Sequence, residues 1–161
     1  MSGPFTMTNV LVLGANGQLA RNTTRVFLRD TDAKLTLYLR RAGRLTNPDP
    51  KRVTMVEGDV LDRPTLEAAM KRQGEVPGER YRSVLDPYRD SAAVIEGSDL
   101  DYTILRPGWF TRDEEVAYQI TQKGEPFKGH DVSLNSLSDL IVKLALTPGM
   151  ESRQSLGVSV R

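Results

Sequence analysis

Two glycines and an alanine at three-residue spacing are the first feature of the sequence that could do chemistry. Gly14, Gly17 and Ala20 form the pattern G-x-x-G-x-x-A directly after the apolar run of residues 10–13. A glycine at the first position adopts backbone angles that a side chain forbids, and one at the second lets a phosphate approach the main chain. The N–H groups at the start of a following helix would then bind the phosphates. The pattern predicts a pyrophosphate site, although a plain strand-to-helix turn can contain the same residues.

The segments around this pattern favour the first interpretation. Residues 10–13 are continuously apolar, as in a strand buried on both faces. Apolar and small residues then recur at helical spacing over residues 19–27, and residues 35–39 have the pattern of a second strand. Strand, glycine turn, helix and strand in this order are the context that a dinucleotide-binding turn requires. The sequence therefore predicts nucleotide binding.

Basic residues at the end of the second strand bear on which nucleotide binds. Arg40, Arg41 and Arg44 stand where NAD-binding domains usually carry an Asp or Glu for the ribose hydroxyls. A guanidinium pairs with a 2′-phosphate, whereas a carboxylate repels it. We expect NADP rather than NAD, with Arg40 as the first contact and Arg41 or Arg44 as helpers. A solvated basic loop is the alternative.

A third strand is predicted over residues 53–57, followed by Asp59 and Val60. The carboxyl end of that strand lies on the adenine side of a doubly wound nucleotide site. Asp59 would accept a hydrogen bond from the adenine amino group while Val60 packs on the ring. Asp59 would equally well cap a turn, and the residues do not decide between the two roles.

The chain resembles the atypical short-chain dehydrogenase/reductase group, in particular the NmrA-like NAD(P)H-binding proteins, which are similar to NAD-dependent epimerases and dehydratases. Residues 14–20, 57–60, 101–109 and 126–129 carry the resemblance. It implies an α/β fold of the Rossmann type, with a doubly wound parallel sheet between helices in three layers. It also implies that the proline turn of residues 107–109 lies beside the nicotinamide.

The pattern and the resemblance together give one set of candidate cofactor-binding residues. They are Gly14, Asn16, Gly17, Gln18, Leu19, Arg40, Arg41, Asp59, Val60, Pro107 and Trp109.

The family fold implied by the resemblance needs two more central strands between Asp59 and Tyr102. Residues 71–83 are charged, contain glycine and proline, and have no strand pattern. We expect roughly 50 residues to be absent from this sequence near residues 71–74, judging by the usual size of two strands and their helices. Otherwise the chain is truly short and its sheet closes differently. We treat residues 1–161 as a single NAD(P)-binding domain, with its central strands absent from this sequence.

Catalytic residues cannot be assigned. The wider superfamily uses a Tyr-x-x-x-Lys pair, in which tyrosine acts as general acid or base. The matching positions are Val84 and Tyr88, and neither fits. Tyr88 is either a substitute acid or a packing residue. Trp109 and Phe110 form an apolar wall near the nicotinamide or a substrate, or else they pack in the core.

Three further local predictions concern the second half of the chain. Residues 137–145 have the spacing of a helix, with Ser136 and Asp139 as its capping pair. The acidic residues 113–115 are expected to start another helix, because negative charge suits its N-terminus. His130 is expected on a loop without a chemical role.

Composition excludes several classes of function. The chain has no cysteine, one histidine and a net charge of +1, which argues against disulfides, thiolate catalysis and a histidine metal cluster. It has no apolar run of the length that spans a membrane, and no signal-peptide pattern. We expect a cytoplasmic monomer or homodimer with a small-molecule substrate and without a nucleic-acid or membrane partner.

Two functions compete at this point. The first is an NADP-dependent oxidoreductase that transfers hydride to a small carbonyl or quinone-like compound. The second is a non-catalytic, NADP-sensing regulatory protein that binds a protein partner, because the Tyr-x-x-x-Lys pair is missing. Nucleic-acid binding through the arginines is weaker, since the net charge is close to zero.

The absent segment can be tested on the protein isolated from its natural source. The sequence has a mass of 17.9 kDa, and two strands with their helices would add about 5–6 kDa. Intact-mass spectrometry should therefore give a mass well above that of the sequence. A mass of 17.9 kDa would contradict the expectation.

Overall fold

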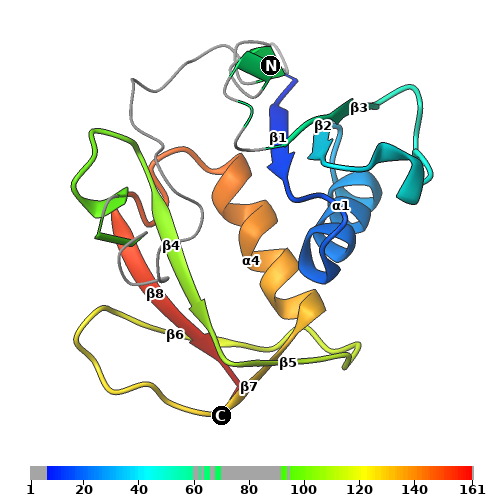
Figure 1. The fold of residues 1–161 in the computed structure, drawn as a ribbon. Coiled ribbons are helices and arrows are strands. Elements are labelled where there is room, and N and C mark those ends of the chain that lie inside the picture. The colour runs from blue at the N-terminus through cyan, green and yellow to red at the C-terminus, as the bar shows by residue number, and fades with distance from the viewer. Residues whose placement is uncertain are drawn as a thin grey trace, which may run out of the picture. The chain divides into compact units, whose positions relative to one another are not determined.

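The computed structural model describes residues 7–59, 62, 64–65, 68–69, 92–93 and 95–160. The chain divides into two compact units, Met1–Arg80 and Tyr81–Arg161. Each unit combines β-strands with an α-helix, as Figure 1 shows. Within the described ranges, no helix has the length and apolar character needed to cross a membrane.

The first unit is built on a three-stranded parallel sheet. Its strands are β1 (Asn9–Leu13), β2 (Lys34–Leu39) and β3 (Val53–Glu57), with β2 in the middle. The register pairs Leu11 with Thr36 and Thr36 with Thr54. All of β2 after Lys34 is buried, whereas most residues of β1 and β3 are partly or fully exposed, as expected of a central strand between two neighbours.

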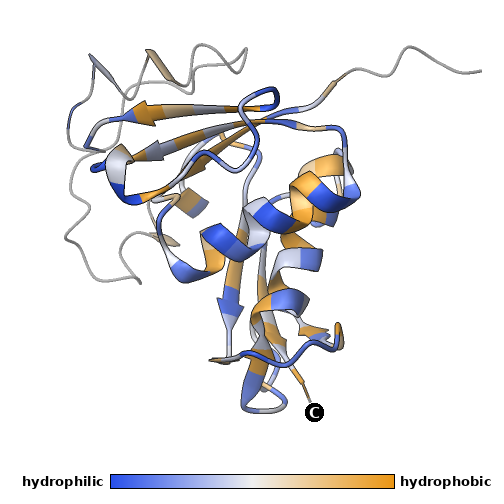
Figure 2. Cartoon of the chain, turned by 90° about the vertical axis from the view of Figure 1, so that its right-hand side faces the viewer, coloured by the Kyte–Doolittle hydropathy of each residue, from blue (hydrophilic) through white to orange (hydrophobic). Residues whose placement is uncertain are grey.

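Helix α1 (Gln18–Asp30) connects β1 to β2. Val26 and Phe27 are buried, while Arg21, Arg25 and Arg29 are exposed. Figure 2 shows hydrophilic and hydrophobic residues alternating along this helix, as in a helix with one face on a sheet.

The C-terminus of α1 is capped by Arg52, which immediately precedes β3. Its guanidinium donates hydrogen bonds to the carbonyl oxygens of Leu28, Thr31 and Ala33, at 3.0, 2.5 and 3.0 Å. A cation at this position also suits the partial negative charge of the helix C-terminus. Arg52 therefore ties the end of α1 to the start of β3.

In the second unit, the described strands form two small sheets. In the first, β8 (Gln154–Ser159) lies between β4 (Thr103–Pro107), which is parallel to it, and β6 (Gln119–Thr121), which is antiparallel. The second pairs β5 (Trp109–Thr111) with β7 (Asp131–Ser133) in parallel.

Helix α4 (Leu134–Leu146) follows β7, and its buried side chains include Leu137 and Leu140. The predicted capping pair is wrong. Ser133 is the N-cap, and its hydroxyl oxygen accepts a hydrogen bond from the N–H of Ser136 at 2.9 Å. Asp139 instead accepts a hydrogen bond from Tyr118.

The acidic residues 113–115 do not start a helix, contrary to prediction. Asp113 accepts a hydrogen bond from the Thr111 hydroxyl at 2.6 Å. The carbonyl oxygen of Glu115 accepts a bond from the Ser133 hydroxyl at 3.0 Å. This main chain is therefore bonded to the start of α4 rather than to a helix of its own.

The strand predictions agree closely with the structure. Residues 53–57 coincide with β3, and the other predicted strands differ from the observed ones by a residue or two. Among the described residues, β1 pairs only with β2 and β4 pairs only with β8. Within the described part of the chain, β1 and β4 therefore each have one side without a partner strand. The interval proposed for the absent segment, residues 71–74, lies outside the described residues.

Gly58 tests the packing at the end of β3. A Cβ there would lie 2.7 Å from Cζ of Tyr38 and 2.9 Å from Cγ2 of Thr65. We expect Gly58→Ala to lower the free energy of unfolding by about 1–3 kcal/mol, because Tyr38 is fixed in place. Chemical denaturation measures this loss. Gly43→Ala is the control, since its Cβ would meet no atom within 4 Å, and a similar loss in both variants would contradict the prediction.

Candidate nucleotide-binding site

The turn between β1 and α1 has the geometry that the glycine pattern predicts. Gly14 has a φ of +67°, a conformation that costs other residues about 1–2 kcal/mol. The N–H of Gly17 donates to the carbonyl oxygen of Gly14 at 2.9 Å, which closes the turn. A Cβ on Gly17 would lie only 3.3 Å from that oxygen. The backbone conformation at position 14 therefore favours glycine, and a side chain at position 17 would crowd the turn.

The N-terminus of α1 follows this turn without a neutralising group. Gly17 is the N-cap and offers no side chain to the first N–H groups, and the first turn contains no acid. The first helical hydrogen bond runs from the N–H of Arg21 to Gly17 at 2.9 Å. The N–H groups of Gln18, Leu19 and Ala20 thus have no acceptor within the helix, and they carry its partial positive charge. These features fit a bound phosphate.

Backbone hydrogen bonds hold the carboxyl ends of β1, β2 and β3 next to one another. The N–H of Ala15 donates to the carbonyl oxygen of Tyr38 at 3.3 Å, and the N–H of Gly58 donates to that of Leu39 at 3.0 Å. The segments that follow the three strands therefore start close to one another. They are the glycine turn, the arginine loop and the turn at Asp59.

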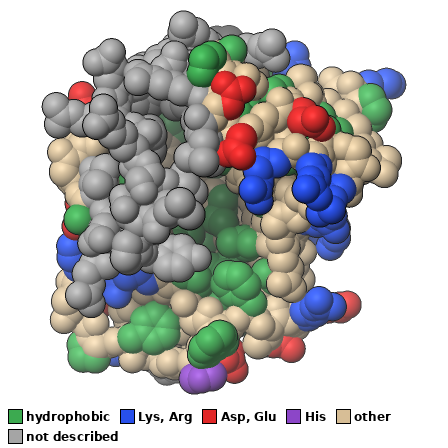
Figure 3. Space-filling view, viewed as in Figure 1, with side chains coloured by type: hydrophobic (Ala, Val, Ile, Leu, Met, Phe, Trp, Pro, Cys, Tyr) green, Lys and Arg blue, Asp and Glu red, His purple; other side chains and the backbone are tan. Residues whose placement is uncertain are grey.

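The arginine loop leaves β2 at Arg40 and includes the short 3₁₀ helix η1 (Ala42–Arg44). Arg40, Arg41 and Arg44 are exposed, and within the described chain their side chains form no hydrogen bond or ion pair. The N–H of Ala42 donates to Oε2 of Glu57 at 2.7 Å, which fixes the loop to the end of β3. Basic side chains gather over α1 and the neighbouring loops, with acidic ones beside them (Figure 3).

Asp59 takes part in the turn after β3 through its main chain, and the capping role of its carboxylate stays a prediction. Its carbonyl oxygen accepts hydrogen bonds from the N–H of Asp62 and from the Tyr38 hydroxyl, both at 2.8 Å. Burial raises the pKa of Tyr38, and the carboxylates of Asp62 and Asp59 raise it further. The contact of Asp59 with adenine stays a prediction, and Val60 lies outside the described residues.

The remaining candidate residues belong to the second unit. Pro107 ends β4, and Trp109 starts β5. Trp109 and Phe110 are 74% and 47% exposed, so the alternative that they pack in the core is wrong. His130 lies on a loop, as predicted, and its Nδ1 is 2.5 Å from Oδ1 of Asp131. Hydrophobic side chains are visible beside this histidine in Figure 3.

A tyrosine, an aspartate and a lysine meet in the second unit, and the spacing of these residues in the sequence does not predict it. The Tyr118 hydroxyl donates to Asp139 at 2.8 Å, and Nζ of Lys143 lies 2.7 Å from the same carboxylate. Burial raises the pKa of Tyr118, and the bond to Asp139 raises it further against the effect of Lys143. Tyr118 is thus not activated as a base. The positions of the superfamily pair, Val84 and Tyr88, lie outside the described residues.

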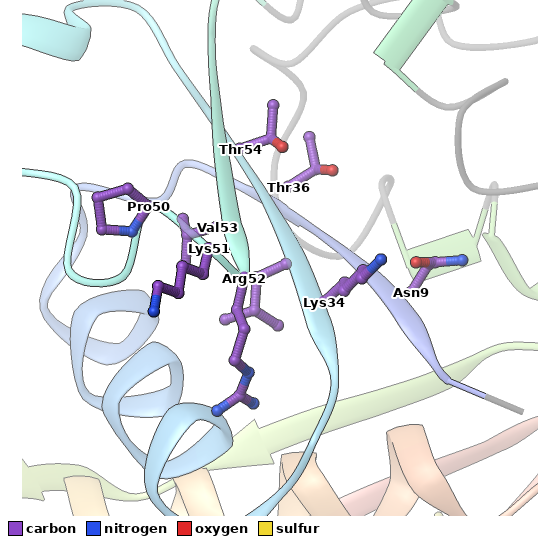
Figure 4. Close-up of a pocket in the computed structure, with 9 residues that line it drawn as sticks. Asn9, Lys34, Thr36, Pro50, Lys51, Arg52, Val53 and Thr54 are labelled. Carbon is purple, nitrogen blue, oxygen red and sulfur yellow. The ribbon is translucent and has the colours of Figure 1, made fainter. Parts of the chain in front are cut away.

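A hollow of about 340 Å³ lies at the opposite end of the first sheet from the glycine turn. Asn9, Lys34 and Val53, which begin the three strands, line it, together with Arg52 (Figure 4). The Arg52 guanidinium is already bonded to carbonyl oxygens at the end of α1. The hollow is therefore distinct from the nucleotide site. In the described residues, no group of three or more His, Asp or Glu is placed to hold a metal ion.

Comparisons with known proteins agree with this geometry. Among solved structures, the chain is 31% identical to a Rossmann-fold NAD(P)-binding family protein from Shigella flexneri, with a TM-score of 0.83 over 96% of this chain and 94% of that one. It is 25% identical to a short-chain dehydrogenase/reductase from Veillonella parvula, with a TM-score of 0.79 over 96% and 95% of the two chains. A further solved structure of a short-chain dehydrogenase/reductase from Veillonella parvula, in complex with NADP, shares the fold at 24% identity, with a TM-score of 0.77 over 94% of each chain. No curated protein matches the sequence significantly.

The fold is therefore an α/β fold of the Rossmann type, as predicted. The chain belongs to the NAD(P)H-binding family, whose model matches residues 14–76 and 72–148. The first match begins at the glycine turn. The two matches overlap at residues 72–76. This overlap includes part of the interval 71–74 where we expect an absent segment, and that segment stays a prediction.

The Tyr118 cluster predicts a dependence of stability on alkaline pH. Folding raises the pKa of Tyr118 above 10.0 and that of Lys143 above 10.5. Their contribution to stability is therefore complete below these values and is lost as pH rises through the folded-state pKa. We expect Tyr118→Phe to make the fall in Tm between about pH 9.5 and 11.5 shallower than in the wild type. Thermal unfolding gives the Tm of each protein at each pH, and the Tm of the same protein at pH 7 is the reference. If Tm falls equally steeply with pH in Tyr118→Phe and in the wild type, the prediction is wrong.

Proposed function

We propose that this protein is an NADP(H)-dependent oxidoreductase that transfers hydride to a small carbonyl or quinone-like substrate. The observation that carries the proposal is the glycine turn, which sets the uncapped N-terminus of α1 beside the exposed arginines that follow β2. Membership of the NAD(P)H-binding family supports the same site. When bound, the nicotinamide supplies the hydride chemistry.

The protein's own residues bind and orient the nucleotide. The N–H groups of Gln18, Leu19 and Ala20 hold the pyrophosphate, with Gly14 and Gly17 keeping side chains away from it. The chain continues directly from the buried strand β2 into Arg40, so this residue starts from a fixed point. Its guanidinium is free of other bonds in the described chain and pairs with the 2′-phosphate.

The substrate class rests on the second unit. Trp109 and Phe110 are neighbouring exposed aromatic residues of β5. An exposed aromatic surface suits a flat, unsaturated compound, because ring faces and edges attract one another. Pro107 and Trp109 are proposed to contact the nicotinamide, as the family resemblance implies.

A non-catalytic NADP sensor is the second candidate. It is favoured by the absence of a Tyr-x-x-x-Lys pair from the sequence and by the raised pKa of Tyr118. Such a protein would bind NADPH without turning it over and would pass the signal to a protein partner.

Nucleotide titration tests the cofactor assignment. We expect NADPH to bind at least tenfold more tightly than NADH, because a charge-assisted pair is worth about 1.5–3 kcal/mol. Arg40→Ala should remove most of this difference by weakening NADPH alone. Arg29→Ala, which removes the same charge next to Asp30 at the other end of α1, is the control. Fluorescence or calorimetric titration gives the dissociation constants.

The same preparations separate the two candidate functions. An oxidoreductase oxidises NADPH when small quinones or carbonyl compounds are supplied, which absorbance at 340 nm follows. Tight NADPH binding without turnover on such a panel favours the sensor. If neither NADPH nor NADH binds to the wild type, the proposed site itself is wrong.

A further inference from the structure

We propose that Arg21 is a pyrophosphate-binding residue and that Asn16 positions it. The proposal rests on the proposed nucleotide site and adds a contact that the glycine pattern does not predict. Arg21 lies in the first turn of α1, and Asn16 lies within the glycine turn. Both are exposed, so both are accessible to a ligand at the turn.

Two hydrogen bonds join these side chains. Nε and Nη2 of Arg21 donate to Oδ1 of Asn16, at 3.1 and 2.5 Å. The guanidinium is thus directed back from the helix to the turn that precedes it. Because a guanidinium has five N–H donors, the two bonds leave three for another acceptor. Phosphate oxygens suit this planar set of donors.

The charge of Arg21 is unfavourable where it lies unless an anion binds nearby. A cation in the first turn opposes the helix dipole, and no acid is present in that turn to offset it. Arg21, Arg25 and Arg29 also follow one another at four-residue spacing, where like charges repel. Arg29 is paired with Asp30 at 2.6 Å, whereas the partner of the Arg21 side chain among the described residues is the neutral amide of Asn16. A phosphate at the glycine turn would remove this imbalance.

The placement of Arg21 indicates the pyrophosphate rather than the 2′-phosphate. Arg21 is bonded to a residue of the glycine turn itself, next to the uncapped N–H groups of α1. The 2′-phosphate is the proposed partner of Arg40, which follows β2. Since NADPH and NADH share the pyrophosphate, Arg21 contributes equally to the binding of both. Asn16 then acts mainly by holding Arg21 rather than through the cofactor.

Parallel titrations of variants test this role. We expect Arg21→Ala to weaken NADPH, NADH and ADP about tenfold each, and adenosine, which lacks phosphate, by less than twofold. Arg21→Lys should recover part of the loss, and Asn16→Ala should show a smaller loss with the same pattern. Arg25→Ala is the matched control, because Arg25 also donates to an asparagine, Asn22, but one turn further from the glycines. It should change each affinity less than twofold.

The thermal stability of the nucleotide-free variants separates binding from folding. A structural role would make Arg21→Ala unfold at a lower temperature than the wild type. If Arg21 instead lies unfavourably in the field of the helix dipole, Arg21→Ala should have the same Tm as the wild type or a higher one.

Three results would overturn the assignment. If Arg21→Ala binds the nucleotides as tightly as the wild type, the assignment of Arg21 is wrong, and the proposed function is unaffected. A loss confined to NADPH would place Arg21 at the 2′-phosphate instead. Failure of the wild type to bind any of these nucleotides would reject the proposed function together with this inference.

Discussion

Parallel pairing of β2 with both of its neighbours is the constraint on which the nucleotide site depends. Because β1, β2 and β3 run in one direction, the segments that leave them all begin at the same edge of the sheet. Tyr38 reinforces this arrangement, since its main chain bonds to Ala15 and its hydroxyl bonds to Asp59. Gly58 leaves the space that the tyrosine ring occupies. Three segments far apart in the sequence therefore become one surface.

In the proposed site, phosphate binding and the choice between NADP and NAD depend on different parts of that surface. The turn at Gly14 and Gly17 presents main-chain groups, which recognise phosphate without reading the rest of the nucleotide. Side chains such as Arg40 lie on a loop that Glu57 fixes through the N–H of Ala42. Loop residues can change without disturbing the turn, because the turn depends on backbone conformation. Nucleotide preference can therefore vary on a constant phosphate site.

Features set by local sequence could be predicted, and features set by contacts between distant segments could not. Strand β3 was predicted to the residue, because a β-branched and apolar run between a basic loop and a glycine leaves little choice. The cap of α4 was misplaced because Ser136 and Ser133 both fit a capping pattern, and only the bond to the N–H of Ser136 decides it. The capping role of Arg52 could not be predicted from the sequence, since the carbonyl oxygens that it binds belong to a different, distant segment. Arg21 differs, because a cation in the first turn of a helix, where an acid is preferred, is visible in the sequence itself.

The capping of α1 by Arg52 changes the electrostatic field of the helix in the surrounding solvent. An isolated helix has poles of opposite sign, so its field weakens with the cube of distance, whereas the field of a single charge weakens with the square. Arg52 cancels the negative pole through its bonds to Leu28, Thr31 and Ala33. What remains at the glycine turn acts as a positive monopole, whose field extends further before salt screens it over about 8 Å. An anion approaching from solution is therefore drawn toward one end of the helix, and the rate of its capture falls as ionic strength rises.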